Sequence, residues 1–280
     1  MTHGIPSKTL NDGLEVPAIG FGTANIKGSA GVSIISSAID TGYRLIDSAF
    51  NYENEGAVGA AIRRSSIPRE QLRITSKLPG RHHSYKKAVT TIQESLLRAG
   101  LDYYDLYLIH WPNPKQEMYV EAWQALIDAK KWGLIRSIGV SNFLPEHLEK
   151  IIHETGVTPS MNQVELHPYF SQETQRSYHQ EHGIITESWS PLGRASHVLE
   201  NKDIQSIAQT HDKTIPQIIL RWHIQLGALP LPKASSAGRQ RENLAVFDFS
   251  LSDQEMHTIN KLAKPDGRIH DQDPANYEEF

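Results

Sequence analysis

Short apolar runs alternate with longer amphipathic segments along most of the 280-residue chain. The apolar runs are bounded by turn-forming or polar residues, which is typical of buried β-strands. They lie at residues 18–22, 44–47, 72–76, 105–110, 137–141, 161–165, 184–189 and 228–232. The segments between them carry apolar residues at helical spacing. These segments predict helices at residues 32–40, 55–64, 86–99, 117–130, 146–154, 172–181, 216–225 and 239–246.

Eight strand–helix units in a chain of this length predict an α/β fold, namely a single (β/α)8 TIM barrel. An open, doubly wound sheet is the competing arrangement. Asp12-Gly13 separates two short runs near the N-terminus and predicts a β-hairpin over residues 8–16, which we expect to close the bottom of the barrel. We therefore expect one domain over residues 1–280, with the barrel at about 18–247 and an extra helix and polar tail at 251–280.

Composition narrows the class of protein. The 28 Lys and Arg residues against 32 Asp and Glu give a mildly acidic chain, which predicts no general affinity for nucleic acid or anionic membrane. The absence of cysteine excludes disulfides, a thiolate nucleophile and a Cys-ligated zinc. The N-terminus lacks the pattern of a secretory signal, and no apolar stretch reaches the ~20 residues that span a bilayer. We expect a cytoplasmic protein.

Polar or aromatic side chains follow most of the predicted strands. Barrel enzymes carry their reactive residues at the C-terminal ends of the strands. The residues at these positions are Asp47, Lys77, His110, Ser141, Asn142, Gln163, Trp189 and Lys233. We expect them to surround one active site.

Four segments of the chain resemble the aldo-keto reductase family. They are residues 42–59 (GYRLIDSAFNYENEGAVG), 106–112 (LYLIHWP), 138–143 (IGVSNF), and 232–243, which contains Lys233, Arg239, Glu242 and Asn243. The resemblance runs from about Leu10 to the C-terminus and is strongest to the bacterial diketogluconate reductase branch, because of the short loop after His110 and the stretch from Trp189 to Gly193. It implies an NADPH-dependent reductase of aldehydes or ketones, with keto sugar acids and small dicarbonyls among the candidate substrates.

The chemistry of the reaction gives the same assignment of the catalytic residues as the resemblance. Reducing a carbonyl needs a hydride at carbon and a proton at oxygen, and Tyr52 is the candidate proton donor. A free tyrosine titrates near ~10, so a neighbouring ammonium from Lys77 is expected to lower its pKa. Asp47 would keep Lys77 charged, and His110 would orient the substrate by donating a hydrogen bond to the carbonyl oxygen.

The resemblance also implies the cofactor site for NADPH (NADP+). The carboxamide would lie against Ser141, Asn142 and Gln163, and Trp189 would stack on the nicotinamide. Lys233 and Arg239 would hold the 2′-phosphate, since a guanidinium and an ammonium suit a doubly charged anion. The remaining predicted cofactor contacts are Thr23 under the nicotinamide ribose, Ser190, Leu192 and Gly193 along the pyrophosphate, Glu242 and Asn243 at the adenine, and also Asp47 and Ser235.

Three positions depart from the family pattern. Ala24 and Pro79 stand where many relatives carry large aromatic residues, so a roomier substrate pocket is expected. The predicted substrate contacts are Ala24, Phe50, His110 and Trp111. Ala234 stands where a serine is common, so one hydrogen bond to the 2′-phosphate, worth roughly 1.5–3 kcal/mol, is expected to be missing.

Other kinds of site are disfavoured by the sequence. Gly20-Phe21-Gly22 begins like a dinucleotide-binding turn, but the third glycine and the acidic ribose partner are missing. The histidine pairs 82/83 and 179/182 have no accompanying carboxylate cluster, so no metal site is expected. A metal- or base-dependent isomerase on the same barrel is disfavoured as well, because the sequence shows no carboxylate cluster to support it.

One alternative function remains open. It is a cofactor-binding barrel with weak catalysis that acts through a protein partner. The complete set of Asp47, Tyr52, Lys77 and His110 favours the enzyme, whose expected partner is a small-molecule carbonyl substrate. The resemblance further implies a monomer.

Overall fold

The fold is taken from a computed structural model, which describes residues 4–194, 196–265, 267–270 and 272–280. Within these residues, eight parallel strands form one sheet in the order β10-β9-β8-β7-β6-β5-β4-β3. The strands are β3 (Phe21–Gly22), β4 (Leu45–Asp47), β5 (Arg73–Leu78), β6 (Tyr104–Ile109), β7 (Ile135–Ser141), β8 (Met161–Glu165), β9 (Ile185–Trp189) and β10 (Leu229–Pro230).

The two outer strands of this sheet meet and close it. The amide of Gly20 donates to Pro230 O, and the amide of Gly22 donates to Pro232 O, each at 3.1 Å. An open sheet would leave these groups at a free edge. The predicted (β/α)8 barrel is therefore confirmed, and the doubly wound alternative is wrong.

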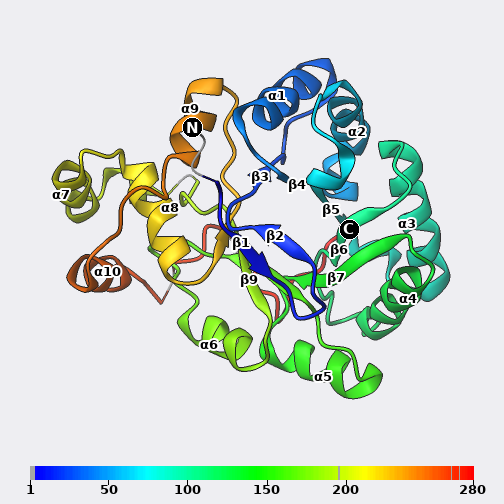
Figure 1. Cartoon of the computed structure of the whole chain (residues 1–280). Helices are drawn as coiled ribbons and strands as arrows, with labels where there is room; N and C mark the ends of the chain where they lie inside the picture. Colours follow the sequence, from blue (N-terminus) through cyan, green and yellow to red (C-terminus); the bar gives the residue numbers. More distant parts are fainter. Residues whose placement is uncertain (1–3, 195, 266, 271) are drawn as a thin grey trace.

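The helices follow the strands and form the outer layer (Figure 1). They are α1 (Gly28–Thr41), α2 (Glu55–Arg64), α3 (Tyr85–Ala99), α4 (Tyr119–Lys131), α5 (Pro145–Thr155), α6 (Glu173–Glu181), α7 (Lys202–His211), α8 (Ile215–Gln225), α9 (Ala237–Leu244) and α10 (Asp253–Asn260). Short 3-10 turns occur at η1 (Phe50–Tyr52), η2 (Arg69–Gln71), η3 (Gly80–His82) and η4 (His197–Glu200). The pattern predicted all of these helices except α7.

The N-terminal hairpin forms as predicted, from β1 (Ser7–Thr9) and β2 (Glu15–Pro17). Gly13 lies in its turn at φ 88°, a left-handed conformation that glycine adopts without a steric penalty. The hairpin lies across the near end of the barrel in Figure 1. Leu10 and Val16 pack there with the interior barrel residues Leu45, Leu106 and Met161, so the bottom of the barrel is sealed by apolar contact.

The C-terminal tail crosses the opposite end of the barrel. After α10, the Lys264 amide donates to Tyr169 O and the Ile269 amide donates to the Glu165 carboxylate. Further along, the Glu279 amide donates to the side chain of Asn113, in the loop after β6. The described residues of the tail that the sequence predicted as polar thus cover the C-terminal ends of the strands.

Candidate active site

A buried ion pair joins β4 and β5 at the C-terminal end of the barrel. The Lys77 ammonium donates to both carboxylate oxygens of Asp47, at 2.7 and 2.8 Å, and to Ser48 O at 2.8 Å. Both side chains are almost fully buried. Burial is the largest single effect and lowers the pKa of Lys77, but the charge and hydrogen bonds of Asp47 together with the effects of Tyr52 and Glu187 outweigh it, and the net pKa is raised. The geometry thus holds Lys77 in place as a cation beside Asp47.

Tyr52 lies at the end of the 3-10 turn η1, directly above this pair. Its ring centroid is 4.9 Å from Lys77 Nζ and 5.8 Å from the ring centroid of His110. Burial raises the pKa of Tyr52, and the opposing effect of Lys77 does not outweigh it. Lys77 acts in the direction expected from the sequence, but the net shift is upward, so the phenol keeps its proton at neutral pH.

Gln163 and Glu187 extend the network into the barrel. The Gln163 amide nitrogen donates to Asp47 Oδ1 at 2.9 Å and to Glu187 Oε2 at 2.6 Å. Because both carboxylates accept from the same amide nitrogen, the orientation of the Gln163 amide is fixed. Burial, followed by the repulsion of Asp47, raises the pKa of Glu187 to about 8. Sequence reasoning did not identify Glu187, which lies inside strand β9.

His110, which follows β6, faces the C-terminal tail on one side. Its Nδ1 lies 2.7 Å from Glu279 Oε1, and its side chain is 13% exposed, so it is accessible from the cavity. Burial would raise the pKa of Glu279, but the nearby His110 and several hydrogen bonds lower it overall, which keeps the carboxylate charged.

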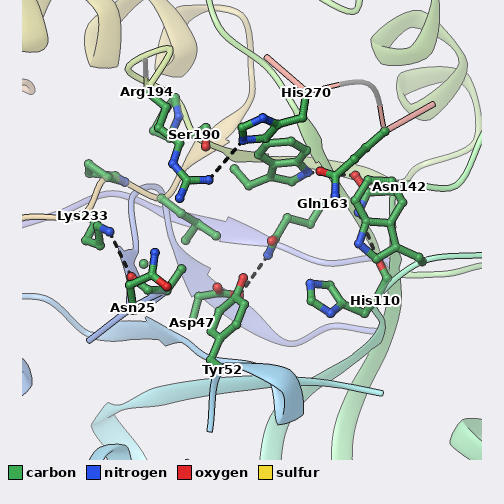
Figure 2. Close-up of a pocket in the computed structure, with 18 of the residues that line it drawn as sticks. Asn25, Asp47, Tyr52, His110, Asn142, Gln163, Ser190, Arg194, Lys233 and His270 are labelled. Atoms are coloured by element: carbon green, nitrogen blue, oxygen red, sulfur yellow. Dashed lines mark hydrogen bonds between the residues drawn. The ribbon is translucent and has the colours of Figure 1, made fainter. Parts of the chain in front are cut away.

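A cavity of about 450 Å³ opens above these residues (Figure 2). Eleven of the residues singled out from the sequence line it: Ala24, Asp47, Tyr52, His110, Trp111, Asn142, Gln163, Trp189, Ser190, Leu192 and Lys233. They lie in the C-terminal parts of different barrel strands and in the segments that follow these strands. Residues that lie far apart along the chain, and that were predicted at the ends of different strands, thus meet in one cavity.

One wall of the cavity presents an aromatic face and an amide. The indole nitrogen of Trp189 donates to Asn142 Oδ1 at 2.8 Å, and the Asn142 amide donates to His110 O and Ser141 Oγ, each at 3.0 Å. Asn142 has φ 61°, which asparagine tolerates better than most residues. The wall is therefore held rigidly, and the indole is free to stack on a planar ring.

Two cations lie at the other side of the cavity. In Figure 2, Lys233 and Arg194 are placed opposite His110 and Asn142. Desolvation, followed by the repulsion of Arg194, lowers the pKa of Lys233. Among the described residues, neither cation forms an ion pair with a carboxylate; Lys233 donates to Ala24 O, and Arg194 approaches His270. Such a pair suits a phosphate-bearing ligand.

The loop between Trp189 and Arg194 is shaped by its backbone. Ser190 and Gly193 both have positive φ, and the Gly193 amide donates to Ser190 O. A Cβ at Gly193 would collide with Ser196 Oγ and Val198, so the tight turn needs glycine there. The turn directs Ser190 and Leu192 toward the cavity, although Gly193 itself does not line it.

Several predicted site residues lie outside the cavity lining. Lys77, Thr23 and Ser141 are buried beneath it, and Thr23 and Ser141 donate to Asp47 O and Gln163 O. Phe50 packs its ring on the guanidinium of Arg98, 3.9 Å away, rather than on the cavity. The other four belong to the segment that follows β10: Ser235 and Arg239 are exposed, Glu242 accepts from Thr214, and Asn243 is buried.

Ten lining residues were not among the site residues predicted from the sequence: Gly22, Asn25, Pro191, Arg194, Leu231, Pro232, His270, Gln272, Tyr277 and Glu279. Four of them belong to the tail. Tyr277 packs on Trp111 with ring centroids 4.5 Å apart and supplies an aromatic wall to the cavity, which Ala24 also lines. The expected loss of aromatic wall is therefore partly offset by the tail. The aromatic residues Tyr277 and Phe280 in a mostly polar tail were the sequence signal from which a contribution of the tail to the cavity could have been predicted.

The histidine pair 179/182 contacts neighbouring side chains. His179 is buried and contacts Asn162, Gln175 and Thr186 through its two ring nitrogens, and burial lowers its pKa to about 3. His182 stacks on Tyr178. No group of three or more potential metal ligands occurs among the residues that the structure describes.

Comparison with known proteins places this geometry in context. The sequence matches the model of the Aldo/keto reductase family over residues 18–264. It is 50% identical to 2,5-diketo-D-gluconic acid reductase B of Corynebacterium sp. (strain SHS752001), over 99% of each chain. Among solved structures, a variant of Gox0644 in complex with NADPH is 38% identical with a TM-score of 0.94, over 99% of this chain and 100% of that one. The Bombyx mori aldo-keto reductase in complex with NADP is 34% identical with a TM-score of 0.90, over 99% of this chain and 98% of that one.

Proposed function

The chain belongs to the aldo/keto reductase family, and we propose that it reduces an aldehyde or ketone to the alcohol with NADPH, with Tyr52 donating the proton to the carbonyl oxygen. The observation that carries the assignment of Tyr52 is its position above the buried Lys77–Asp47 pair and beside His110, at the floor of the cavity.

Tyr52 is suited to deliver the proton and then to hold the resulting charge. When bound, NADPH supplies a hydride to the carbonyl carbon. Because the pKa of Tyr52 is raised, the phenol is protonated at neutral pH and is ready to donate. As its O–H bond breaks, negative charge develops on the phenolate, which the neighbouring Lys77 ammonium stabilises.

Asp47 and His110 have supporting parts in this proposal. Asp47 fixes the position and charge of Lys77 through contacts of both carboxylate oxygens. His110 reaches the cavity from the neighbouring strand end, where a ring N–H can donate to the carbonyl oxygen and orient it toward Tyr52. The carbonyl carbon is thereby presented to the wall formed by Trp189 and Asn142.

The residues present fit the parts of NADPH. Trp189 offers a face for the nicotinamide, with Asn142, Ser141 and Gln163 for its carboxamide. Lys233 and Arg194 offer two cations for the phosphates. The other contacts proposed for the cofactor are Thr23, Asp47, Ser190, Leu192, Gly193, Ser235, Arg239, Glu242 and Asn243.

We further propose that the whole of residues 1–280 acts as one domain, as a cytoplasmic monomer. The family match over residues 18–264 supports the single domain. No helix in the described part of the chain is long and apolar enough to span a membrane. Sedimentation of the purified protein tests the monomer directly.

The phosphate site is tested by comparing NADPH with NADH. We expect kcat/KM with NADPH to exceed that with NADH, and Lys233→Ala to remove most of the difference, because the ammonium pairs with the 2′-phosphate. The exposed Lys150→Ala is the matched control and should leave the ratio unchanged. Binding is followed by the quenching of Trp189 emission. A ratio near one in the wild-type protein, or an unaltered ratio in Lys233→Ala, would overturn this assignment.

A further inference from the structure

A carboxylate from the C-terminal tail lies against one ring nitrogen of His110. Glu279 is the penultimate residue and lines the cavity together with Tyr52, His110 and Trp111. Its Oε1 lies 2.7 Å from His110 Nδ1. This nitrogen is buried, and no other group forms a hydrogen bond with it in the part of the chain that the structure describes. The state of this side of the ring therefore depends on the carboxylate of Glu279.

The carboxylate is held in its ionised form. Its Oε1 accepts from the Asn51 amide at 2.7 Å, and its Oε2 accepts from the backbone amide of Gly80 at 2.9 Å. Asn51 in turn accepts from the Arg81 guanidinium at 2.6 Å. Burial would raise the pKa of Glu279, but the charge of His110 and these hydrogen bonds lower it overall. An ionised carboxylate is an acceptor only, so it can only receive a proton contact from the ring.

The backbone around Glu279 is fixed as well. The Asn113 amide donates to Glu279 O at 2.9 Å, and the Glu279 amide donates to Asn113 Oδ1 at 3.1 Å. A Cβ at Gly80 would collide with the side chain of Asn113, so this close approach needs glycine. The position of the carboxylate beside the histidine ring is therefore set by the fold.

The short contact decides which nitrogen of His110 carries a proton. A nitrogen lone pair 2.7 Å from a carboxylate oxygen would be repelled, so a proton lies between the two atoms. Because Glu279 is ionised, this proton belongs to Nδ1. A neutral imidazole has only one N–H, so its Nε2 would then be an acceptor. His110 can donate from Nε2 to a carbonyl oxygen only while the ring is protonated on both nitrogens.

The other ionisable groups near the ring supply no competing charge. Tyr52, whose ring centroid is 5.8 Å from that of His110, is neutral because burial raises its pKa. Lys77 and Asp47 neutralise each other. His83, which also faces the tail carboxylate, is neutral since burial lowers its pKa to about 4. The tail carboxylate is thus the counter-ion of the His110 ring.

We propose that Glu279 is a positioning residue, which keeps a proton on His110 Nδ1 so that His110 orients the substrate carbonyl as an imidazolium. The inference rests on the proposed function and adds the C-terminal tail to the same site. An imidazolium donates from Nε2 and places a positive charge beside the oxygen on which negative charge develops. Reduction is supported while the ring is doubly protonated, and it is lost as pH rises and Nε2 gives up its proton.

The pH dependence of reduction tests this role. Glu279→Gln keeps the size of the side chain but removes the counter-ion of the imidazolium. We expect kcat/KM for the reduction of benzaldehyde with NADPH to decline at a pH about one unit lower than in the wild type. The variant should be about 10-fold slower above both midpoints and within a few-fold of the wild type below them. A site that is merely damaged would be slower at every pH.

The matched control is Glu278→Gln. It removes the same charge from the neighbouring residue, whose carboxylate bonds the Lys115 amide and Gln116 and does not line the cavity. Its pH profile should have the midpoint of the wild type.

The protonation of His110 is also measured directly, because Glu187, with a pKa of about 8, titrates in the same barrel. In the protein labelled with 15N-histidine and saturated with NADP+, the signals of His110 are assigned by their absence in His110→Gln. The wild-type ring should lose its proton from Nε2 and keep the proton on Nδ1. In Glu279→Gln, the titration midpoint of this ring should fall by about one pH unit.

Each contrary outcome has a separate meaning. A neutral wild-type ring with its proton on Nε2, or an unchanged NMR midpoint in Glu279→Gln, overturns the inference. An unshifted pH profile of reduction also overturns it, because the imidazolium would then not be the form that orients the carbonyl. A shift in Glu278→Gln as large as that in Glu279→Gln would make the general charge of the tail the cause. Failure of the wild type to reduce any carbonyl with NADPH would instead contradict the proposed function, and the NMR titration would still decide the role of Glu279.

Discussion

Ionisable side chains inside the barrel are connected from strand to strand. Lys77 binds Asp47, and the Gln163 amide joins Asp47 to Glu187, with each of these contacts between 2.6 and 2.9 Å. Asp47 and Lys77 could be predicted from the sequence because each directly follows or ends an apolar run. Glu187 could not, since a glutamate within a strand carries no sign of whether it faces the interior or the solvent.

Glu187 makes stability depend on pH. Its folded-state pKa of about 8 lies above the ordinary value of 4.5, so its contribution to stability is fully present below pH 4.5 and is lost as pH rises through 8. Glu187→Gln keeps the contact with Gln163 but cannot ionise. We expect the free energy of unfolding of the variant to rise relative to that of the wild type between pH 4.5 and 8, with a difference on the order of 2–3 kcal/mol at pH 7.

Urea unfolding at several pH values measures this difference. Glu149→Gln, at an exposed position, serves as the control, and its free energy of unfolding should depend on pH in the same way as that of the wild type. A difference between Glu187→Gln and the wild type that is constant with pH would show that Glu187 does not titrate as described.

At the scale of elements, the strands and most helices followed from hydrophobic periodicity, because each barrel strand is buried on both faces. The helix α7 was not predicted because a (β/α)8 barrel has one helix between successive strands, whereas this chain has both α7 and α8 between β9 and β10. Its signals were present, however. Ile204, Ile207 and Ala208 are spaced for one buried face, and Asn201 precedes them as an N-cap that accepts from the amides of Asp203 and Ile204.

The cap of α7 gives a prediction at this scale. Asn201→Ala removes the acceptor for two amides at the start of the helix and should lower the free energy of unfolding by about 1 kcal/mol. Gln205→Ala, at an exposed position on the same helix, should change it by less than about 0.5 kcal/mol. Thermal unfolding of both variants checks this, and equal stabilities would show that the cap contributes nothing.

At the scale of the whole molecule, the two ends of the chain close opposite ends of the barrel. The hairpin seals the bottom with apolar contacts that the sequence pattern revealed. The tail covers the top through single hydrogen bonds to residues remote in sequence, such as Asn51, Gly80 and Asn113. Such contacts have no period, so the pattern could not predict them, and with them the contribution of Tyr277 and Glu279 to the cavity was missed.

In the proposed mechanism, Tyr52 delivers the proton at the floor of that cavity. Tyr52→Phe removes only the hydroxyl, so NADPH should bind with unchanged affinity, whereas kcat for carbonyl reduction should fall by about 10²–10⁴-fold. Tyr85→Phe, whose hydroxyl bonds Asp128 on the outer surface, is the matched control and should retain the wild-type rate. If Tyr52→Phe binds NADPH and reduces the substrate at a rate within a few-fold of the wild type, Tyr52 is not the proton donor.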